Sequence, residues 1–171
     1  MKSPPLYAVH YISVRARAEP IHLLLAYAGV PCVRHDYSLK EVGAKAHKAR
    51  CGQYAQLPAL ELLETGPKEG RVLFQSGTIM RYLAKRHGLV PADDLDAAAA
   101  DEIFELSQEL AKSNPLVNLA PPEGRSEALA AFLDKGAGNG SGYPIGQTLG
   151  AARDKLGDRA FFGGDAPCFA D

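Results

Sequence analysis

The stretch Tyr11-Ile12-Ser13-Val14-Arg15-Ala16-Arg17-Ala18-Glu19-Pro20-Ile21 leads from a strand into a helix. Upstream, Leu6–Ile12 alternates aromatic and β-branched residues with smaller or polar ones, which predicts a strand. Downstream, Pro20 fits a first helical turn, where its missing N–H loses no partner. Apolar residues recur at helical spacing until Gly29, which suits a left-handed helix end. With a second strand over Val33–Tyr37, the order predicts a βαβ unit with parallel strands.

The next segment continues as a helix and then a hairpin. Val42–Cys51 is rich in lysine and alanine and predicts a weak helix. The apolar runs Ala59–Leu63 and Val72–Phe74 are separated by turn residues, which predicts an antiparallel pair of strands. Ser76 is a candidate cap for a further helix that Gly88 ends. We therefore expect a small mixed sheet with helices packed on it.

After an exposed linker at residues 89–94 the strand signals disappear. Helical spacing is found over Leu95–Lys112, Ser126–Lys135 and Thr148–Leu156. Glycine is dense over Gly136–Gly146, which predicts a loop. The sequence thus predicts an α/β domain over residues 1–88 followed by an all-α domain over residues 89–171.

The composition narrows the function classes. The chain has 171 residues, of which 46% are hydrophobic and 23% charged, an ordinary globular balance. The net charge of -1 argues against a nucleic-acid partner, and the apolar runs are too short to span a membrane. The N-terminus lacks a signal-peptide pattern, and the three cysteines fit free thiols in a reducing compartment. The histidine spacing predicts no metal site, and we expect a cytoplasmic protein.

Four motifs in order resemble the cytosolic glutathione transferases of the tyrosine type, closest to the sigma, pi, mu and alpha classes. They are the stretch from Tyr11 to Ile21, Gln56-Leu57-Pro58 with its cis-proline pattern, Gln75-Ser76-x-x-Ile79-x-Arg81-Tyr82-Leu83, and Gly163-Gly164-Asp165-Ala166-Pro167-x-x-Ala170-Asp171. The resemblance implies a thioredoxin-like first domain, a helical second domain and a homodimer. It also implies a detoxifying transferase that joins glutathione, its co-substrate, to small hydrophobic electrophiles and needs no cofactor.

Conjugation requires the thiolate of glutathione, because the thiolate is the nucleophile. Lowering a thiol pKa by about two units needs roughly 2.7 kcal/mol, and one hydrogen bond to a charged group supplies about 1.5–3 kcal/mol. By resemblance, the donor of that bond is Tyr11, at the end of the first strand. Tyr7 on the same strand face is a rival that we assign to the core, and Ser13 is a rival because other classes use a serine here.

The remaining contacts with glutathione are assigned by resemblance to residues spread along the first domain. The γ-glutamyl end is assigned to Gln75 and Ser76, whose helix N-terminus offers free N–H groups to an anion. The backbone of Leu57 pairs with the cysteinyl part, beside Gln56 and a turn shaped by Pro58. The cationic candidates are Lys48, for the glycyl carboxylate, and Arg17, whereas Arg15 is assigned to a turn or an interface.

One acid in the second domain has a candidate role across the dimer. Glu109, in an acidic group that is otherwise read as a solvated helix face, matches an acid that reaches the ammonium group of the partner subunit's glutathione.

Compared with the family, the chain has no tryptophan, carries Ala16 between its two arginines, and has Cys168 where a Ser or Thr cap is usual. About three further helices would follow Asp171, so we expect the second domain to be partial and truncated.

Three functions fit this pattern. The first is the transferase, and some related tyrosine-class enzymes are glutathione-dependent isomerases instead. The second is a non-catalytic structural relative, such as a lens crystallin derived from this family. The third is a truncated copy that binds glutathione without turnover.

Overall fold

The computed structural model describes residues 4–51, 56–64, 66–119, 122–127, 130 and 145–171. The chain divides into two compact units, Met1–Gly88 and Leu89–Asp171. None of the helices in these described ranges combines the length and apolar character that crossing a bilayer requires.

The first unit begins with the predicted βαβ arrangement. Strand β1 (Tyr7–Ile12) is followed by helix α1 (Glu19–Tyr27) and strand β2 (Cys32–Tyr37). β1 and β2 pair in parallel, with His10 opposite His35. Pro20 lies in the first turn of α1, and Gly29 has a φ of +67° just beyond its end. The local signals that predicted this unit are therefore confirmed.

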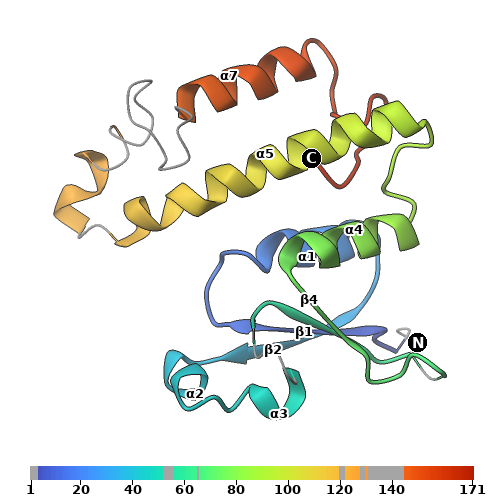
Figure 1. Ribbon diagram of the computed structural model, residues 1–171, viewed down its shortest axis with the longest axis vertical. Coiled ribbons are helices and arrows are strands. Elements are labelled where there is room, and N and C mark those ends of the chain that lie inside the picture. The colour runs from blue at the N-terminus through green and yellow to red at the C-terminus, as the bar shows by residue number, and fades with distance from the viewer. Residues whose placement is uncertain (1–3, 52–55, 65, 120–121, 128–129, 131–144) are drawn as a thin grey trace. The chain divides into compact units, whose positions relative to one another are not determined.

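An antiparallel hairpin completes the sheet. Strands β3 (Ala59–Leu62) and β4 (Val72–Phe74) pair with each other, and β3 also pairs with β1. The resulting four-stranded sheet has the order β2-β1-β3-β4. Helix α4 (Ser76–Arg86) lies beside α1 over one face of this sheet, and α2 and α3 lie on the other side (Figure 1). This is the predicted thioredoxin-like α/β domain, and its core contains fully buried side chains from the strands and from both helices, among them Tyr7, Leu25, Leu60, Ile79 and Leu83.

The helix predicted over Val42–Cys51 is wrong. The structure has two short helices instead, α2 (Leu39–Gly43) and α3 (Lys48–Cys51). Ser38 begins α2 with a capping box, in which its hydroxyl accepts the N–H of Glu41 and the Glu41 carboxylate accepts the N–H of Ser38. Lys45 has a φ of +59°, a left-handed conformation that separates the two helices. The capping signal Ser-x-x-Glu is present in the sequence at Ser38 and Glu41, but the prediction placed the helix start later, on the basis of the alanine and lysine content.

The cap of α4 was also predicted at the wrong residue. Gln75, not Ser76, occupies the cap position, and Ser76 is the first residue of the helix. Gln75 has φ +69° and ψ 116°, so the chain enters the helix through a left-handed residue. A serine cap needs an extended backbone, which the tight passage from β4 does not provide at position 76.

The described elements of the second unit are helical. They are α5 (Asp94–Leu119), the 3₁₀ turn η1 (Pro122–Gly124) and α7 (Ile145–Leu156), with α5 and α7 side by side (Figure 1). α5 is longer than predicted: its backbone stays helical past Lys112, as far as Leu119. α7 begins earlier than predicted and includes Gly146. Most of the predicted helix 126–135 and of the glycine-rich loop lies outside the described residues.

The end of the second unit is fastened by the carboxylate of Asp171. One carboxylate oxygen, Oδ1, accepts the N–H of Phe162, and the other, Oδ2, accepts the N–H of Cys168, both at 2.8 Å. The bond to Cys168 is the reciprocal half of a capping box, in which the acid three residues later accepts the N–H of the cap position. Hydrogen bonds to a charged acceptor are the stronger kind, so this contact stabilises the final loop.

Replacing Asp171 by alanine is expected to lower the free energy of unfolding of the second unit by about 1–3 kcal/mol, because two amide groups lose their acceptor. Thermal unfolding followed by circular dichroism measures the change. Asp165→Ala, at an exposed position in the same loop, is the matched control and should behave as the parent chain. Equal unfolding temperatures for both variants would contradict the prediction.

Candidate functional site

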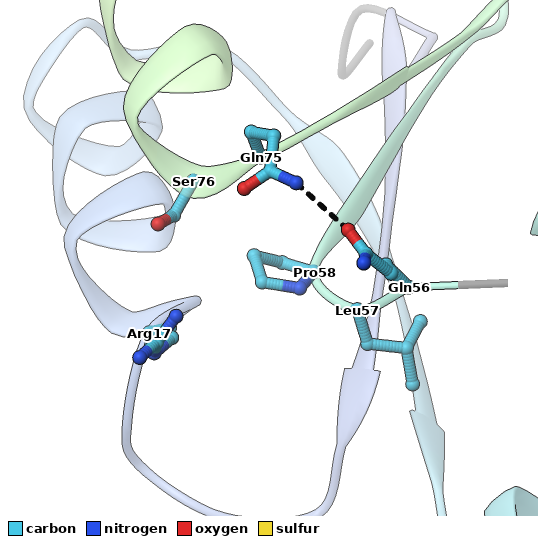
Figure 2. A pocket seen from close by; sticks show the side chains of 6 residues that line it. All are labelled: Arg17, Gln56, Leu57, Pro58, Gln75 and Ser76. Carbon is cyan, nitrogen blue, oxygen red and sulfur yellow. Dashed lines mark hydrogen bonds between the residues drawn. The ribbon is translucent and has the colours of Figure 1, made fainter. Parts of the chain in front are cut away.

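Residues from three separate segments of the first unit line one cleft of about 240 Å³ (Figure 2). The lining comes from the loop before α1, the loop before β3 and the start of α4, and consists of Arg17, Gln56, Leu57, Pro58, Gln75 and Ser76. Figure 2 places Arg17 and Ser76 on one side of the cleft and Gln56 and Leu57 on the other. The sheet order brings these loops together, since β1 and β3 are neighbours and β4, which leads into α4, lies next to β3.

The rim of the cleft is shaped by the two glutamines. The side-chain amide of Gln75 donates a hydrogen bond of 2.7 Å to the side-chain oxygen of Gln56 (Figure 2). The left-handed backbone of Gln75 turns its side chain toward the loop before β3. In that loop the Leu57–Pro58 peptide bond is cis, as the motif suggested. Sequence reasoning missed the contact between the glutamines, because no local pattern links positions 19 residues apart.

The cleft suits an anionic ligand. α4 presents the N–H groups of its first turn and the positive end of its dipole at Ser76. Arg17 adds a guanidinium group, whose donors match a carboxylate. The amide groups of Gln56 and Gln75 provide neutral donors and acceptors on the rim.

Tyr11, the predicted donor, is 7% exposed and is not among the residues that line the cleft. Its hydroxyl oxygen accepts the backbone N–H of Arg17 at 3.3 Å, and the side chain of Arg17 lines the cleft. Because the oxygen accepts this bond, the hydroxyl proton of Tyr11 is directed to another acceptor. The link between Tyr11 and the cleft is therefore the backbone of Arg17.

The structure separates the two rivals of Tyr11. Tyr7 is fully buried, its hydroxyl is 3.2 Å from Nε2 of His87, and burial raises its pKa to about 12. Ser13 is exposed on the loop after β1. Tyr7 is thus a core residue, as the sequence indicated.

Two further predicted residues are not among those that line the cleft. Lys48 is exposed at the first residue of α3. Glu109 is half-buried on α5, in the second unit. In the described part of the chain, no group of three or more histidine, cysteine, aspartate or glutamate side chains is arranged to hold a metal ion.

Comparisons with known proteins agree on one family. The model of the glutathione S-transferase N-terminal domain matches residues 7–85. The chain is 30% identical over 166 residues to glutathione S-transferase P 1 of Xenopus laevis, covering 90% of this chain and 75% of that protein. It is 36% identical over 101 residues to the probable glutathione S-transferase 6 of Caenorhabditis elegans, covering 58% of this chain and 44% of that protein.

Solved structures show the same fold. The structure of NaGST-2 matches with a TM-score of 0.75 at 22% identity, covering 96% of this chain and 75% of that one. A glutathione S-transferase from Ascaris lumbricoides matches with a TM-score of 0.72 at 21% identity, covering 97% of this chain and 76% of that one.

Proposed function

The chain belongs to the glutathione S-transferase family, and from this premise we propose that it conjugates the thiolate of glutathione to small hydrophobic electrophiles. Glutathione is the co-substrate, and the reaction needs no cofactor. The observation that carries the proposal is the cleft itself, where six residues assigned to glutathione from the sequence lie together. We further propose that the protein works in the cytoplasm as a homodimer.

Tyr11 is proposed as the group that keeps the bound thiol ionised. Its oxygen accepts the N–H of Arg17 at 3.3 Å, which leaves the hydroxyl proton for the glutathione sulfur. An N–H donated to the phenol oxygen also makes that proton a better donor. The thiol proton leaves to solvent, and the thiolate then forms the bond to the electrophile and displaces its leaving group.

The charged groups of glutathione are proposed to meet complementary groups of the chain. Arg17 and the start of α4 at Gln75 and Ser76 receive the γ-glutamyl carboxylate, and the backbone of Leu57 pairs with the cysteinyl residue. Lys48 is proposed to reach the glycyl carboxylate. Glu109 is proposed to reach the ammonium group of glutathione bound to the partner subunit of the homodimer.

Retention on immobilised glutathione, combined with turnover of 1-chloro-2,4-dinitrobenzene, tests the proposal. We expect both retention and turnover. Retention without turnover would indicate a module that binds glutathione only, and the absence of both would indicate a structural relative. Either of these results would overturn the proposed activity.

Gln75→Ala is expected to raise the KM for glutathione about two- to tenfold and to leave kcat within about twofold, because a binding contact is lost. Gln75→Gly also lacks the side-chain amide, but glycine adopts a φ of +69° without backbone strain. This variant therefore shows whether the loss of the amide alone raises the KM. Both variants should show the raised KM in steady-state kinetics. Thr78→Ala, exposed on the same helix, is the control. A normal KM in Gln75→Gly would show that the amide does not contribute to binding.

A further inference from the structure

A group of polar side chains is packed against the face of the sheet opposite to Tyr11. His10 precedes Tyr11 on β1, and successive side chains of a strand point to opposite faces. His10 is fully buried, although histidine is usually only partly so. Its neighbours come from β2, β3 and α3, and with them it forms what we call the histidine hub: His10, His35, Tyr37, Arg50 and Glu61.

The bonds of His10 determine which of its nitrogens carries the proton. Nε2 lies 2.9 Å from a carboxylate oxygen of Glu61, which can only accept, so Nε2 carries a proton. In the neutral ring Nδ1 is then an acceptor, and the hydroxyl of Tyr37, 3.0 Å away, donates to it. Burial lowers the pKa of His10, and the hydrogen bond to Glu61 opposes that change only in part, so the ring is neutral at pH 7.

The second histidine is bound in the same way. His35 lies opposite His10 in the strand register, and the two rings stack with their centroids 4.6 Å apart. Nη1 of Arg50 is 3.4 Å from Nε2 of His35. A guanidinium can only donate, so this contact requires an unprotonated Nε2 on His35. Arg50 is also 3.9 Å from the carboxylate of Glu61.

The charges of the histidine hub balance while the ring of His10 is neutral. In that state the guanidinium of Arg50 faces one carboxylate, that of Glu61. Protonation of His10 would add a positive charge beside the stacked ring of His35 and beside the guanidinium that bonds to it. Within the described residues, Cys51, His47 and Glu41 also face the histidine hub, next to Tyr37. The thiol of Cys51 is neutral because burial raises its pKa, so it supplies no compensating charge.

The histidine hub joins the elements that carry the proposed glutathione contacts. His10 is adjacent to Tyr11 on β1, and Glu61 is on β3, which begins directly after Pro58. Arg50 is on α3, the short helix that begins at Lys48. Arg50 joins this helix of four residues to β2 through its contact with His35, and the fully buried Cys51 anchors the same helix.

We propose that the histidine hub positions α3, and with it Lys48, for glutathione, and that protonation of His10, which is stacked on the ring that bonds to Arg50, loosens the histidine hub and weakens glutathione binding. The proposal rests on the proposed function, because Lys48 is assigned to the glycyl carboxylate there. For His10 the lowered pKa means that the native arrangement is favoured above about pH 6.5 and loses stability as the pH falls below that value.

The test compares binding of S-methylglutathione at about pH 7 and about pH 5.5 by isothermal titration calorimetry. This ligand has no thiol to titrate, and its carboxyl groups lose their protons near pH 3.5. We expect the dissociation constant of the parent chain to rise about fivefold on acidification. A change of this size corresponds to the protein taking up less than one proton when it releases one ligand. In His10→Gln, whose amide does not titrate and can still donate to Glu61 and accept from Tyr37, the change should be less than about twofold.

Two variants make the result specific. Arg50→Gln removes the cation at a position that is 58% exposed, so folding is not at risk, and it should bind about fivefold more weakly already at pH 7 with little further loss. His22→Gln removes a histidine of α1 outside the histidine hub and should keep the full pH dependence of the parent chain. A parent chain whose affinity does not change with pH, or a His10→Gln variant that retains the whole change, overturns the proposal.

A second measurement does not depend on glutathione. Cys51 is on α3 and fully buried, so its reaction with 4,4′-dithiodipyridine reports the opening of that helix. At about pH 5.5 we expect Cys51 to react several-fold faster in the parent chain than in His10→Gln, with buried Cys168 of the second unit as the reference in peptide mass spectrometry. Equal rates overturn the positioning role. If S-methylglutathione does not bind at pH 7 but the rates differ, the proposed function fails while the proton-dependent opening of α3 stands.

Discussion

Tyr11→Phe is expected to reduce kcat/KM for conjugation about 10- to 100-fold, while the dissociation constant of glutathione stays within about threefold. The phenylalanine ring fills the same buried space, so the fold is retained. What is lost is the hydroxyl, which accepts the backbone N–H of Arg17 and is proposed to stabilise the thiolate. The pKa of the bound thiol should then rise toward the value of about 8.5 for a free thiol.

Two readouts separate activation of the thiol from binding. The pH dependence of kcat/KM and the ultraviolet absorbance of the bound thiolate should both move to higher pH in Tyr11→Phe. Tyr27→Phe, which removes an exposed hydroxyl from α1, is the matched control. Ser13→Ala and Tyr7→Phe test the rival donors and should keep the pH profile of the parent chain. A Tyr11→Phe enzyme with an unchanged profile would exclude Tyr11 as the activating group.

Ile79→Ala is expected to lower the free energy of unfolding of the first unit by about 2–5 kcal/mol, because it opens a cavity in a packed core. Ile79 is fully buried on α4, which packs on α1 and on the hairpin strands. α4 also carries Gln75 and Ser76 at its start, so loosening its core contact should weaken glutathione binding as well.

Urea unfolding followed by circular dichroism measures this change. Leu23→Ala is the control, since Leu23 is 63% exposed on α1 and should change the unfolding free energy by less than about 0.5 kcal/mol. A similar midpoint for Ile79→Ala and Leu23→Ala would show that α4 does not depend on this buried contact.

The sequence by itself determined β1, α1 and β2 of the first unit. Pro20 and Gly29 mark the two ends of α1 through backbone effects that act within a single turn. The residues around Gln56 and Gln75, in contrast, were assigned to the site because their motifs resemble those of a known family, and not from the local chemistry that marks the ends of α1. Local chemistry of this kind is written in consecutive residues and needs no partner from elsewhere in the chain.

Only the tertiary structure decided the left-handed backbone of Gln75, its bond to Gln56 and the histidine hub. The histidines were interpreted as structural residues, and nothing around His10 in the sequence indicates that Glu61 and Tyr37 bond to its two nitrogens. Those partners are 51 and 27 residues away, and they meet His10 because β2 and β3 pair with β1 in one particular register. A shift of one residue in either pairing would turn the partner side chains to the other face of the sheet. Register and sheet order are properties of the assembled sheet, so contacts that depend on them cannot be read from any single segment.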